Sequence, residues 1–235
     1  MEERILVILP CYNEAASIVP LIEEFKNFIR SSGYLIYLVV INDCSTDQTS
    51  SLAKAAQVTV IDLPVNLGIG GAMQTGFLYA LQNNFDLAVQ MDGDGQHPPK
   101  ELQKLLDQYS KTGENLIIGS RFIDKQGFQS SWLRRFGIKY FHWLNRILTG
   151  KSIYDITSGF RLYNRKAIEL VANHYPDEYP EPEALILFSK EKMSIKEVAV
   201  VMRERQGGVS SITNFSQLYY MLKVTLAMIF SKIRK

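Results

Sequence analysis

The sequence predicts an α/β protein with one mostly parallel β-sheet flanked by helices, and three observations lead to this class. Four apolar stretches alternate with four stretches of helical spacing in the first half of the chain, an order typical of strands joined by helices. Each apolar stretch ends in a short polar loop. The 235 residues are 46% hydrophobic and 21% charged, which suits one core-forming domain with appended elements.

The strands and helices of the first half are predicted from the spacing of apolar residues and from the residues that start or end an element. Apolar runs that read as buried strands cover residues 4–9, 34–41, 58–63 and 87–89. Between them lie stretches with helical apolar spacing, and Pro98-Pro99 starts a fourth helix. The second of these helices has Ser45 or Thr46 as its predicted N-cap. The first three helices cover residues 15–30, about 47–56 and about 72–81.

The second half of the chain is less regular. An apolar run at 116–118 and another at 195–202 read as strands, and residues 155–163 read as a loop that enters a strand. Predicted helices cover about 130–149, 183–190 and about 215–233. We therefore expect one domain over 1–211 and a C-terminal amphipathic helix over 212–235 that contacts a membrane or a partner.

An acidic cluster follows the fourth strand. Asp92, Asp94 and Gln96 carry oxygen donors, and the glycines at 93 and 95 let the backbone turn them toward one point. Oxygen ligands suit Mg²⁺ or Mn²⁺, and three protein ligands leave room for phosphate oxygens. Ligands of open α/β sheets bind at the carboxyl ends of the strands. The cluster therefore predicts a cation site for a diphosphate.

Two other motifs fail on spacing. An EF-hand needs Gly at its sixth position and Glu at its twelfth, where this chain has His97 and Gln103. The glycines at 68, 70 and 71 follow the third strand as Gly-x-Gly-Gly, which is not the dinucleotide fingerprint. Tight packing at a helix start and direct phosphate contact remain the two interpretations of this glycine cluster.

The net charge, the start of the chain and the cysteines bear on which partners and which compartment we expect. A formal net charge of +2 does not favour nucleic acid. The start of the chain lacks the pattern of a signal peptide, and no run reaches the ~20 apolar residues of a membrane span. Cys11 and Cys44 suit a reducing compartment and form no disulfide framework. We expect a cytoplasmic protein, peripheral at the inner face of the membrane.

The helix over about 130–149 combines basic and aromatic residues. Its basic residues share one face at spacings of four, three and four, and an apolar stripe lies beside them. Such a helix suits an anionic membrane surface, and a buried helix with a solvated basic edge is the alternative. The basic face comprises Arg135, Lys139, His142 and Arg146, and the stripe comprises Trp132, Phe136, Tyr140, Trp143 and Ile147.

Taken together, the loops resemble those of the family 2 glycosyltransferases of GT-A fold, a single Rossmann-like sheet, and most closely those of the polyprenyl-phosphate sugar synthases. The resemblance covers nearly the whole chain. The motifs that carry it are Pro10-x-Tyr12-Asn13-Glu14, Asn42-Asp43-x-Ser45-x-Asp47, Asn66-x-Gly68, Asp92-x-Asp94-x-Gln96-His97-Pro98, Gly119-Ser120-Arg121, Ser158-Gly159-Phe160-Arg161 and Arg205-x-x-Gly208-x-Ser210.

The resemblance implies roles for these residues. Asp92, Asp94 and Gln96 would hold the cation, and Arg121 and Arg135 would bind the acceptor phosphate. A sugar hydroxyl acceptor would need a general base, for which Asp155, Glu181 and Glu183 are candidates, with Glu183 assigned to catalysis beside Asp92 and Asp94. The donor would be bound by Pro10, Tyr12, Glu14, Asp43, Gly68, Asp92 and Arg205.

The implied activity is inverting, metal-dependent transfer of a sugar from a nucleotide diphosphate sugar, UDP-glucose in preference to GDP-mannose, to a polyprenyl phosphate. Two departures bear on it: Ile69 and Gly70 stand where relatives often carry a Lys, and the chain stops at Lys235, where several relatives add membrane spans. We therefore expect either that the terminal helix docks to the bilayer or that a small separate membrane protein supplies the span. A homo-oligomer also stays open.

Particular residues favour or disfavour three alternative functions. A glycosyltransferase acting on a lipid-linked or cell-surface polysaccharide is favoured by the acids at 181 and 183. A non-catalytic sugar-nucleotide sensor or scaffold is disfavoured by the complete acidic cluster. A sugar-1-phosphate nucleotidyltransferase would open with Gly-x-Gly-Thr-Arg, where this chain has Pro10-Cys11-Tyr12-Asn13-Glu14.

Overall fold

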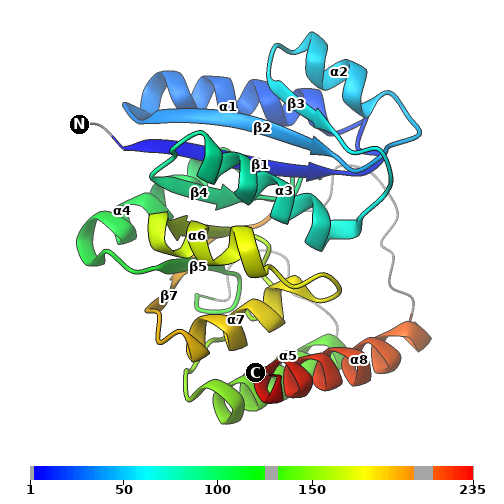
Figure 1. Cartoon of the computed structure of the whole chain (residues 1–235), viewed down its shortest axis with the longest axis vertical. Coiled ribbons are helices and arrows are strands. Elements are labelled where there is room, and N and C mark those ends of the chain that lie inside the picture. Colours follow the sequence, from blue (N-terminus) through cyan, green and yellow to red (C-terminus); the bar gives the residue numbers. More distant parts are fainter. Residues whose placement is uncertain (1–2, 125–131, 204–213, 235) are drawn as a thin grey trace.

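The computed structural model describes residues 3–124, 132–203 and 214–234, without the side chains of 132–136 and 214–218. It contains a seven-stranded sheet with helices on both faces (Figure 1). The order of the strands across the sheet is β3-β2-β1-β4-β6-β5-β7. The strands are β1 (Arg4–Cys11), β2 (Leu35–Asn42), β3 (Thr59–Asp62), β4 (Leu87–Gln90), β5 (Leu116–Ser120), β6 (Arg161–Asn164) and β7 (Ile195–Ala199).

Strand β6 runs antiparallel to its neighbours β4 and β5, and all other neighbouring strands are parallel. The prediction of a mostly parallel sheet is therefore confirmed. Because β6 is reversed, its amino end and the loop before it lie at the edge where the other strands end. The Gly119 N–H donates to the Phe160 carbonyl at 2.8 Å across this edge.

The central strands β1, β4, β5 and β6 are buried on both faces, which is why the first three read as continuous apolar runs. In β1, Ile5, Val7 and Leu9 pack into one core, while Leu6 and Ile8 pack into the other. None of these five side chains is more than 1% exposed. The alternation follows from the two-residue period of a strand.

The helices divide between the two faces. The first core is covered by α1 (Ile18–Ser32), α2 (Thr49–Ala55) and α4 (Leu102–Thr112), the last preceded by a short 3₁₀ turn. The second core is covered by α3 (Gly68–Gln82), α5 (Trp132–Thr149), α6 (Arg165–His174), α7 (Pro180–Lys190) and α8 (Asn214–Ile233). Helices α5 and α8 lie side by side at one end of the molecule (Figure 1).

The structure corrects three local predictions. Helix α6 is absent from the predicted elements, although Asn164 caps it by accepting from the Ala167 N–H at 3.0 Å. The predicted N-cap at Ser45 or Thr46 is wrong, because the first helical N–H of α2, that of Thr49, donates to Asp47 Oδ1 at 2.9 Å. Helix α7 also starts three residues before its predicted start, with Pro180 at its first position.

Helix α5 meets the core mainly through residues outside the predicted apolar stripe, although Tyr140 of the stripe is partly buried against the core. Phe141 and Leu144 are buried, whereas Trp143 and Ile147 of the stripe are each 59% exposed. His142, predicted on the basic face, is half-buried, and its Nδ1 lies 2.7 Å from the Ile153 carbonyl oxygen. No helix among the described residues is long and apolar enough to cross a membrane.

Candidate functional site

The polar loops after β1, β2 and β4 meet at one edge of the sheet. The Asp43 N–H donates to the Cys11 carbonyl at 2.9 Å, so the first two loops start in register. Ser17 Oγ lies 2.8 Å from Glu14 Oε2 and 3.0 Å from the Gly93 carbonyl, which ties the first loop to the acidic loop. The sequence motifs from three strands are thus neighbours in space.

The pKa of the Cys11 thiol also reflects how closely these three loops approach one another. Burial, followed by the charges of Glu14, Asp92, Asp94 and Asp47, raises the pKa of its thiol well above the usual range. These four carboxylates come from the three loops after β1, β2 and β4. The edge of the sheet therefore carries a concentrated negative charge, which favours a bound cation.

The acidic loop is shaped by its own short-range bonds. Asp94 is 7% exposed, and its Oδ1 accepts the N–H of Gln96 at 3.0 Å. Gln96 is held to the segment after β7, because its carbonyl accepts the Arg203 N–H at 2.8 Å and its Nε2 lies 3.5 Å from the Arg203 carbonyl. Asp92 precedes this turn and is half-buried.

Two glycines let the loop pack closely. A Cβ on Gly159 would lie 2.9 Å from both carboxylate oxygens of Asp92, and a Cβ on Gly93 would lie 2.4 Å from Cys11 Sγ. Any side chain at 159 would displace the Asp92 carboxylate. Gly159 belongs to one of the motifs that carry the resemblance, but the sequence alone gave it no role. The reversed strand β6 brings it against Asp92, where only a residue without a side chain fits.

The donor set fits a hard divalent cation. Asp92, Asp94 and Gln96 offer carboxylate and amide oxygens, the ligands that Mg²⁺ and Mn²⁺ prefer. The described residues include no cluster of three or more His, Cys, Asp or Glu side chains able to hold a metal ion by themselves. A cation here would therefore complete its shell with the amide and with oxygens of a ligand.

Asp43 joins the loop after β2 to the start of α3. It is 4% exposed, and its Oδ1 accepts the Leu67 N–H at 2.7 Å. Asn66 Nδ2 donates to the Asp43 carbonyl at 3.2 Å, and Gly68, with φ of 72°, opens the helix. The predicted donor residues Asp43 and Gly68 are thus brought together.

The first loop supplies the remaining described donor residues. Pro10 is buried at the end of β1, Tyr12 is 50% exposed, and Glu14 is half-buried. Asn13 and Cys44 adopt φ of 56° and 58°, a left-handed conformation that is uncommon outside glycine and clusters at functional sites. An exposed aromatic ring beside such a loop suits the base of a nucleotide.

Arg121 lies at the end of β5 and pairs with Asp155. Its Nε and Nη2 donate to the two Asp155 carboxylate oxygens, both at 2.6 Å, and its N–H donates to Oδ2 at 3.1 Å. The Arg121 side chain is 19% exposed and that of Asp155 is 0% exposed. Asp155, a candidate base on sequence, is therefore occupied in positioning the guanidinium.

His97 lies behind the same ion pair. Its ring packs against Phe160 with centroids 4.8 Å apart, and its Nδ1 has no hydrogen-bond partner within the described residues. Burial, followed by the charge of Arg121, lowers the pKa of His97 to about 3. The folded protein therefore keeps this imidazole neutral.

The neutral His97 predicts a pH-dependent stability. Its pKa in the unfolded chain is about 6.5, so between pH 6.5 and 3 the unfolded state binds a proton that the folded state does not. The free energy of unfolding should then fall with falling pH, by up to ~1.4 kcal/mol per pH unit from this residue. Urea unfolding in EDTA between pH 7 and 4.5 measures the slope.

The His97→Gln variant should show a flatter slope than the unaltered protein. The control is His174→Gln, because His174 is an exposed histidine whose removal should keep the slope. Equal slopes in the unaltered protein and His97→Gln would show that His97 does not titrate differently on unfolding.

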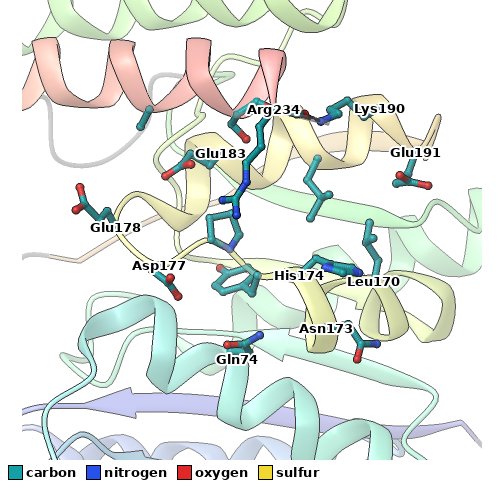
Figure 2. A pocket seen from close by; sticks show the side chains of 15 residues that line it. Gln74, Leu170, Asn173, His174, Asp177, Glu178, Glu183, Lys190, Glu191 and Arg234 are labelled. Atoms are coloured by element: carbon teal, nitrogen blue, oxygen red, sulfur yellow. Dashed lines mark hydrogen bonds between the residues drawn. The ribbon is translucent and has the colours of Figure 1, made fainter.

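Glu183 faces a different cavity. The cavity measures about 760 Å³ and lies between α3, α6, α7 and the end of α8 (Figure 2). Arg234 extends into it beside Glu183, whose Oε1 accepts the Tyr179 N–H at 3.3 Å. Neither Asp92 nor Asp94 is among the described residues that line it. The catalytic role of Glu183 stays a prediction.

Two predicted site residues lie outside the description. Arg205 belongs to residues 204–213, and the Arg135 side chain is one of those not described in α5. Their predicted contacts with the donor phosphates and the acceptor phosphate therefore stay predictions.

Comparisons with known proteins show similarity over most of the chain. Residues 6–171 match the family model described as glycosyl transferase family 2. The chain is 31% identical to a polyprenol monophosphomannose synthase of Mycolicibacterium smegmatis (94% of this chain, 86% of the relative) and 30% identical to an undecaprenyl-phosphate mannosyltransferase of Micrococcus luteus (89% and 88%).

A solved structure shares the fold at lower identity. Glucosyl-3-phosphoglycerate synthase of Mycobacterium tuberculosis, crystallised with Mn²⁺, UDP and glucosyl-3-phosphoglycerate, matches with a TM-score of 0.72 at 20% identity, over 98% of this chain and 80% of that one. The predicted GT-A-like α/β architecture is thereby confirmed.

Proposed function

Because the chain belongs to glycosyl transferase family 2, we propose that it moves a hexose from a nucleotide diphosphate sugar to a polyprenyl phosphate at a membrane surface. The observation that carries the proposal is the meeting of the loops after β1, β2, β4 and β5 at one sheet edge, with Asp43 and Tyr12 on one side of the acidic loop and Arg121 on the other. Asp43 and Tyr12 suit a nucleotide, the acidic loop with its cation suits a diphosphate, and Arg121 suits an anionic acceptor.

The donor end rests on the acidic loop. Asp92, Asp94 and the Gln96 amide would hold Mg²⁺ or Mn²⁺, which when bound supplies positive charge against the leaving diphosphate. Asp43 and Tyr12 would bind the base and ribose. UDP in the solved structure of the same fold supports a uridine donor such as UDP-glucose as the first to test, and the names of the two relatives make mannose the second.

The acceptor end rests on Arg121. A phosphate monoester has a second pKa near ~6, so it is already anionic at pH 7 and needs no general base. The carboxylate of Asp155 holds the guanidinium in place, and Arg121 would bind an incoming phosphate oxygen by a charge-assisted hydrogen bond. This arrangement suits a lipid phosphate better than a neutral sugar hydroxyl.

The membrane would lie against α5 and α8. The exposed apolar residues of α8 recur at spacings of three and four, so they share one face. The two helices contact each other through the Tyr140 hydroxyl, 3.0 Å from Thr225 Oγ1. They contain no Asp or Glu, and Lys139, Arg146, Lys223 and Lys232 are exposed on them. The exposed apolar residues of α5 and α8 are together called the apolar face; they are Trp143, Ile147, Tyr219, Leu222, Leu226, Phe230 and Ile233.

Such a surface suits insertion at the interface of an anionic bilayer. Leu226→Glu combined with Phe230→Glu should lower binding to phosphatidylglycerol-containing vesicles at least tenfold, measured by cosedimentation. The control is Leu78→Glu, an apolar residue of α3 that is 38% exposed. Equal loss in both variants, or no loss in either, would contradict the apolar face as the membrane contact.

The function itself is tested by transfer of radiolabelled sugar. UDP- and GDP-sugars are offered with undecaprenyl or dolichyl phosphate in detergent, with Mn²⁺ or Mg²⁺ and with EDTA. We expect a labelled lipid that disappears with EDTA. Labelling of a soluble glycan but of no lipid phosphate would instead favour the polysaccharide acceptor, and nucleotide binding without any transfer would favour a sensor or a partner-dependent enzyme.

A further inference from the structure

A buried hydrogen-bond network lies directly behind the acidic loop. Gln90, the last residue of β4, is 0% exposed. The hydroxyls of Tyr163 and Tyr175 donate to its Oε1 at 2.9 and 3.0 Å, and its Nε2 donates to Glu181 Oε1 at 2.9 Å. Because an ionised carboxylate only accepts hydrogen bonds, the amide nitrogen faces Glu181, and the amide oxygen accepts from the two tyrosine hydroxyls. The network therefore fixes the orientation of the Glu181 carboxylate.

The backbone of Glu181 is held as well. Arg161 is 0% exposed and donates to the carbonyls of Glu181, Ser158 and Ile156 at 2.9, 2.8 and 2.9 Å. The next residue after Ser158 is Gly159, which lies against the Asp92 carboxylate. The first turn of α7 is thus joined to the acidic loop through a continuous set of contacts.

The position of Glu181 follows from these contacts. Gln90 and Asp92 are two residues apart, so their Cα atoms are separated by at most about 7 Å. Burial lowers the pKa of Arg121, but the charges of Asp155, Asp92 and Glu181 raise it above its usual value. Arg161 also joins Glu181 to the Ile156 carbonyl, next to Thr157, whose Oγ1 accepts from Arg121 Nη2 at 3.2 Å. These bonds place the start of α7 beside both the acidic loop and the Arg121 loop, where the Glu181 carboxylate can meet a group bound between them.

In the proposed function that group is the transferred sugar. The sugar is bonded to the diphosphate at the acidic loop and is attacked by the phosphate at Arg121. Sugar hydroxyls donate hydrogen bonds, and a carboxylate with one oxygen held by Gln90 keeps further lone pairs to accept them. Phosphate groups, in contrast, are repelled by a carboxylate.

We infer that Glu181 is a specificity-determining residue, which binds the hydroxyl groups of the transferred sugar and is positioned by the Gln90 amide and its two tyrosines. The inference rests on the proposed function and deepens its donor site. It assigns sugar recognition to Glu181, whereas the sequence-based prediction gave the catalytic role on α7 to Glu183, which faces the separate cavity of Figure 2.

The test compares binding of a nucleotide with and without its sugar. Dissociation constants for UDP, UDP-glucose, GDP and GDP-mannose are measured by calorimetry with Mg²⁺. In Glu181→Gln, the nucleotide sugar that the unaltered protein prefers should bind about tenfold to a hundredfold more weakly, whereas its parent nucleotide should bind as before. Tyr175→Phe, which removes one donor to Gln90, should cause a smaller loss in the same direction.

The control is Glu178→Gln, an exposed carboxylate three residues before Glu181, which should leave all four constants unchanged. Equal weakening of sugar-bearing and sugar-free nucleotides in Glu181→Gln would show a structural role and overturn the inference. The inference also fails if the sugar-dependent loss follows Glu183→Gln instead. Should Glu181→Gln not fold, Glu181→Asp keeps the charge but shortens its reach, and unchanged sugar affinity in that variant would overturn the inference.

The experiment contains no lipid, so it separates the two proposals. A sugar-dependent loss in Glu181→Gln together with failure to label any polyprenyl phosphate would overturn the acceptor proposal and keep the role of Glu181. Absence of nucleotide binding by the unaltered protein would overturn both.

Discussion

Replacement of Asp94 by Asn is expected to lower kcat/KM for sugar transfer by about a thousandfold while the fold stays intact. Asp94 is 7% exposed, and its Oδ1 accepts the Gln96 N–H at 3.0 Å. The amide oxygen of Asn can keep that bond, so the loop should hold its turn. The lost charge, however, weakens binding of the cation and of the diphosphate that it would neutralise.

Three measurements separate these effects. Circular dichroism and thermal unfolding should match the unaltered protein, which shows that the loop is still folded. Mn²⁺ binding, followed by electron paramagnetic resonance in the presence of the nucleotide, should weaken strongly. Transfer by the unaltered protein in EDTA should fall to a similar level. Normal turnover by Asp94→Asn at ordinary metal concentrations would show that the acidic loop has been misread.

The second large effect is expected at the ion pair behind the acceptor site. Asp155→Ala should lower the free energy of unfolding by about 3–5 kcal/mol, because it leaves the Arg121 guanidinium largely buried without its partner. Asp155 is 0% exposed and accepts three hydrogen bonds from Arg121. Urea unfolding at pH 7 measures the loss.

Two variants serve as comparisons. Glu169→Ala breaks the exposed pair with Arg165, whose side chains are 55% and 38% exposed, and should cost less than ~1 kcal/mol. The double change Arg121→Met with Asp155→Leu removes both charges and should recover much of the stability. A loss in Asp155→Ala no larger than that in Glu169→Ala would contradict a stabilising buried pair.

The same pair bears on function. If Asp155 holds Arg121 toward the acceptor, the double variant should fold yet transfer sugar poorly to a lipid phosphate. Its affinity for nucleotide should stay close to that of the unaltered protein, because Asp43 and Tyr12 are untouched. Arg121 and Asp155 would then contribute both to stability and to acceptor binding. Urea unfolding measures the first contribution, and sugar transfer to a lipid phosphate measures the second.

The sequence alone determined the order of strands and helices in the first half of the chain and the place of the acidic cluster. Each strand there is a continuous apolar run that ends in a polar loop, and the carboxyl ends of parallel strands meet at one edge. Asp43 and Asp92 were therefore predicted at the same edge from local signals. Helix α6 was missed although Ala167, Ile168 and Val171 follow a helical spacing.

Only the tertiary structure decided what the predicted residues contact. Arg121 and Asp155 are 34 positions apart, and Gln90 and Glu181 are 91 apart; no local pattern indicates either pair. The reversed strand β6 brings Gly159 against Asp92. Glu181 and Glu183 stand two residues apart on one helix, so they point about 200° apart around its axis; which of the two faces the acidic loop is set by what the helix packs against.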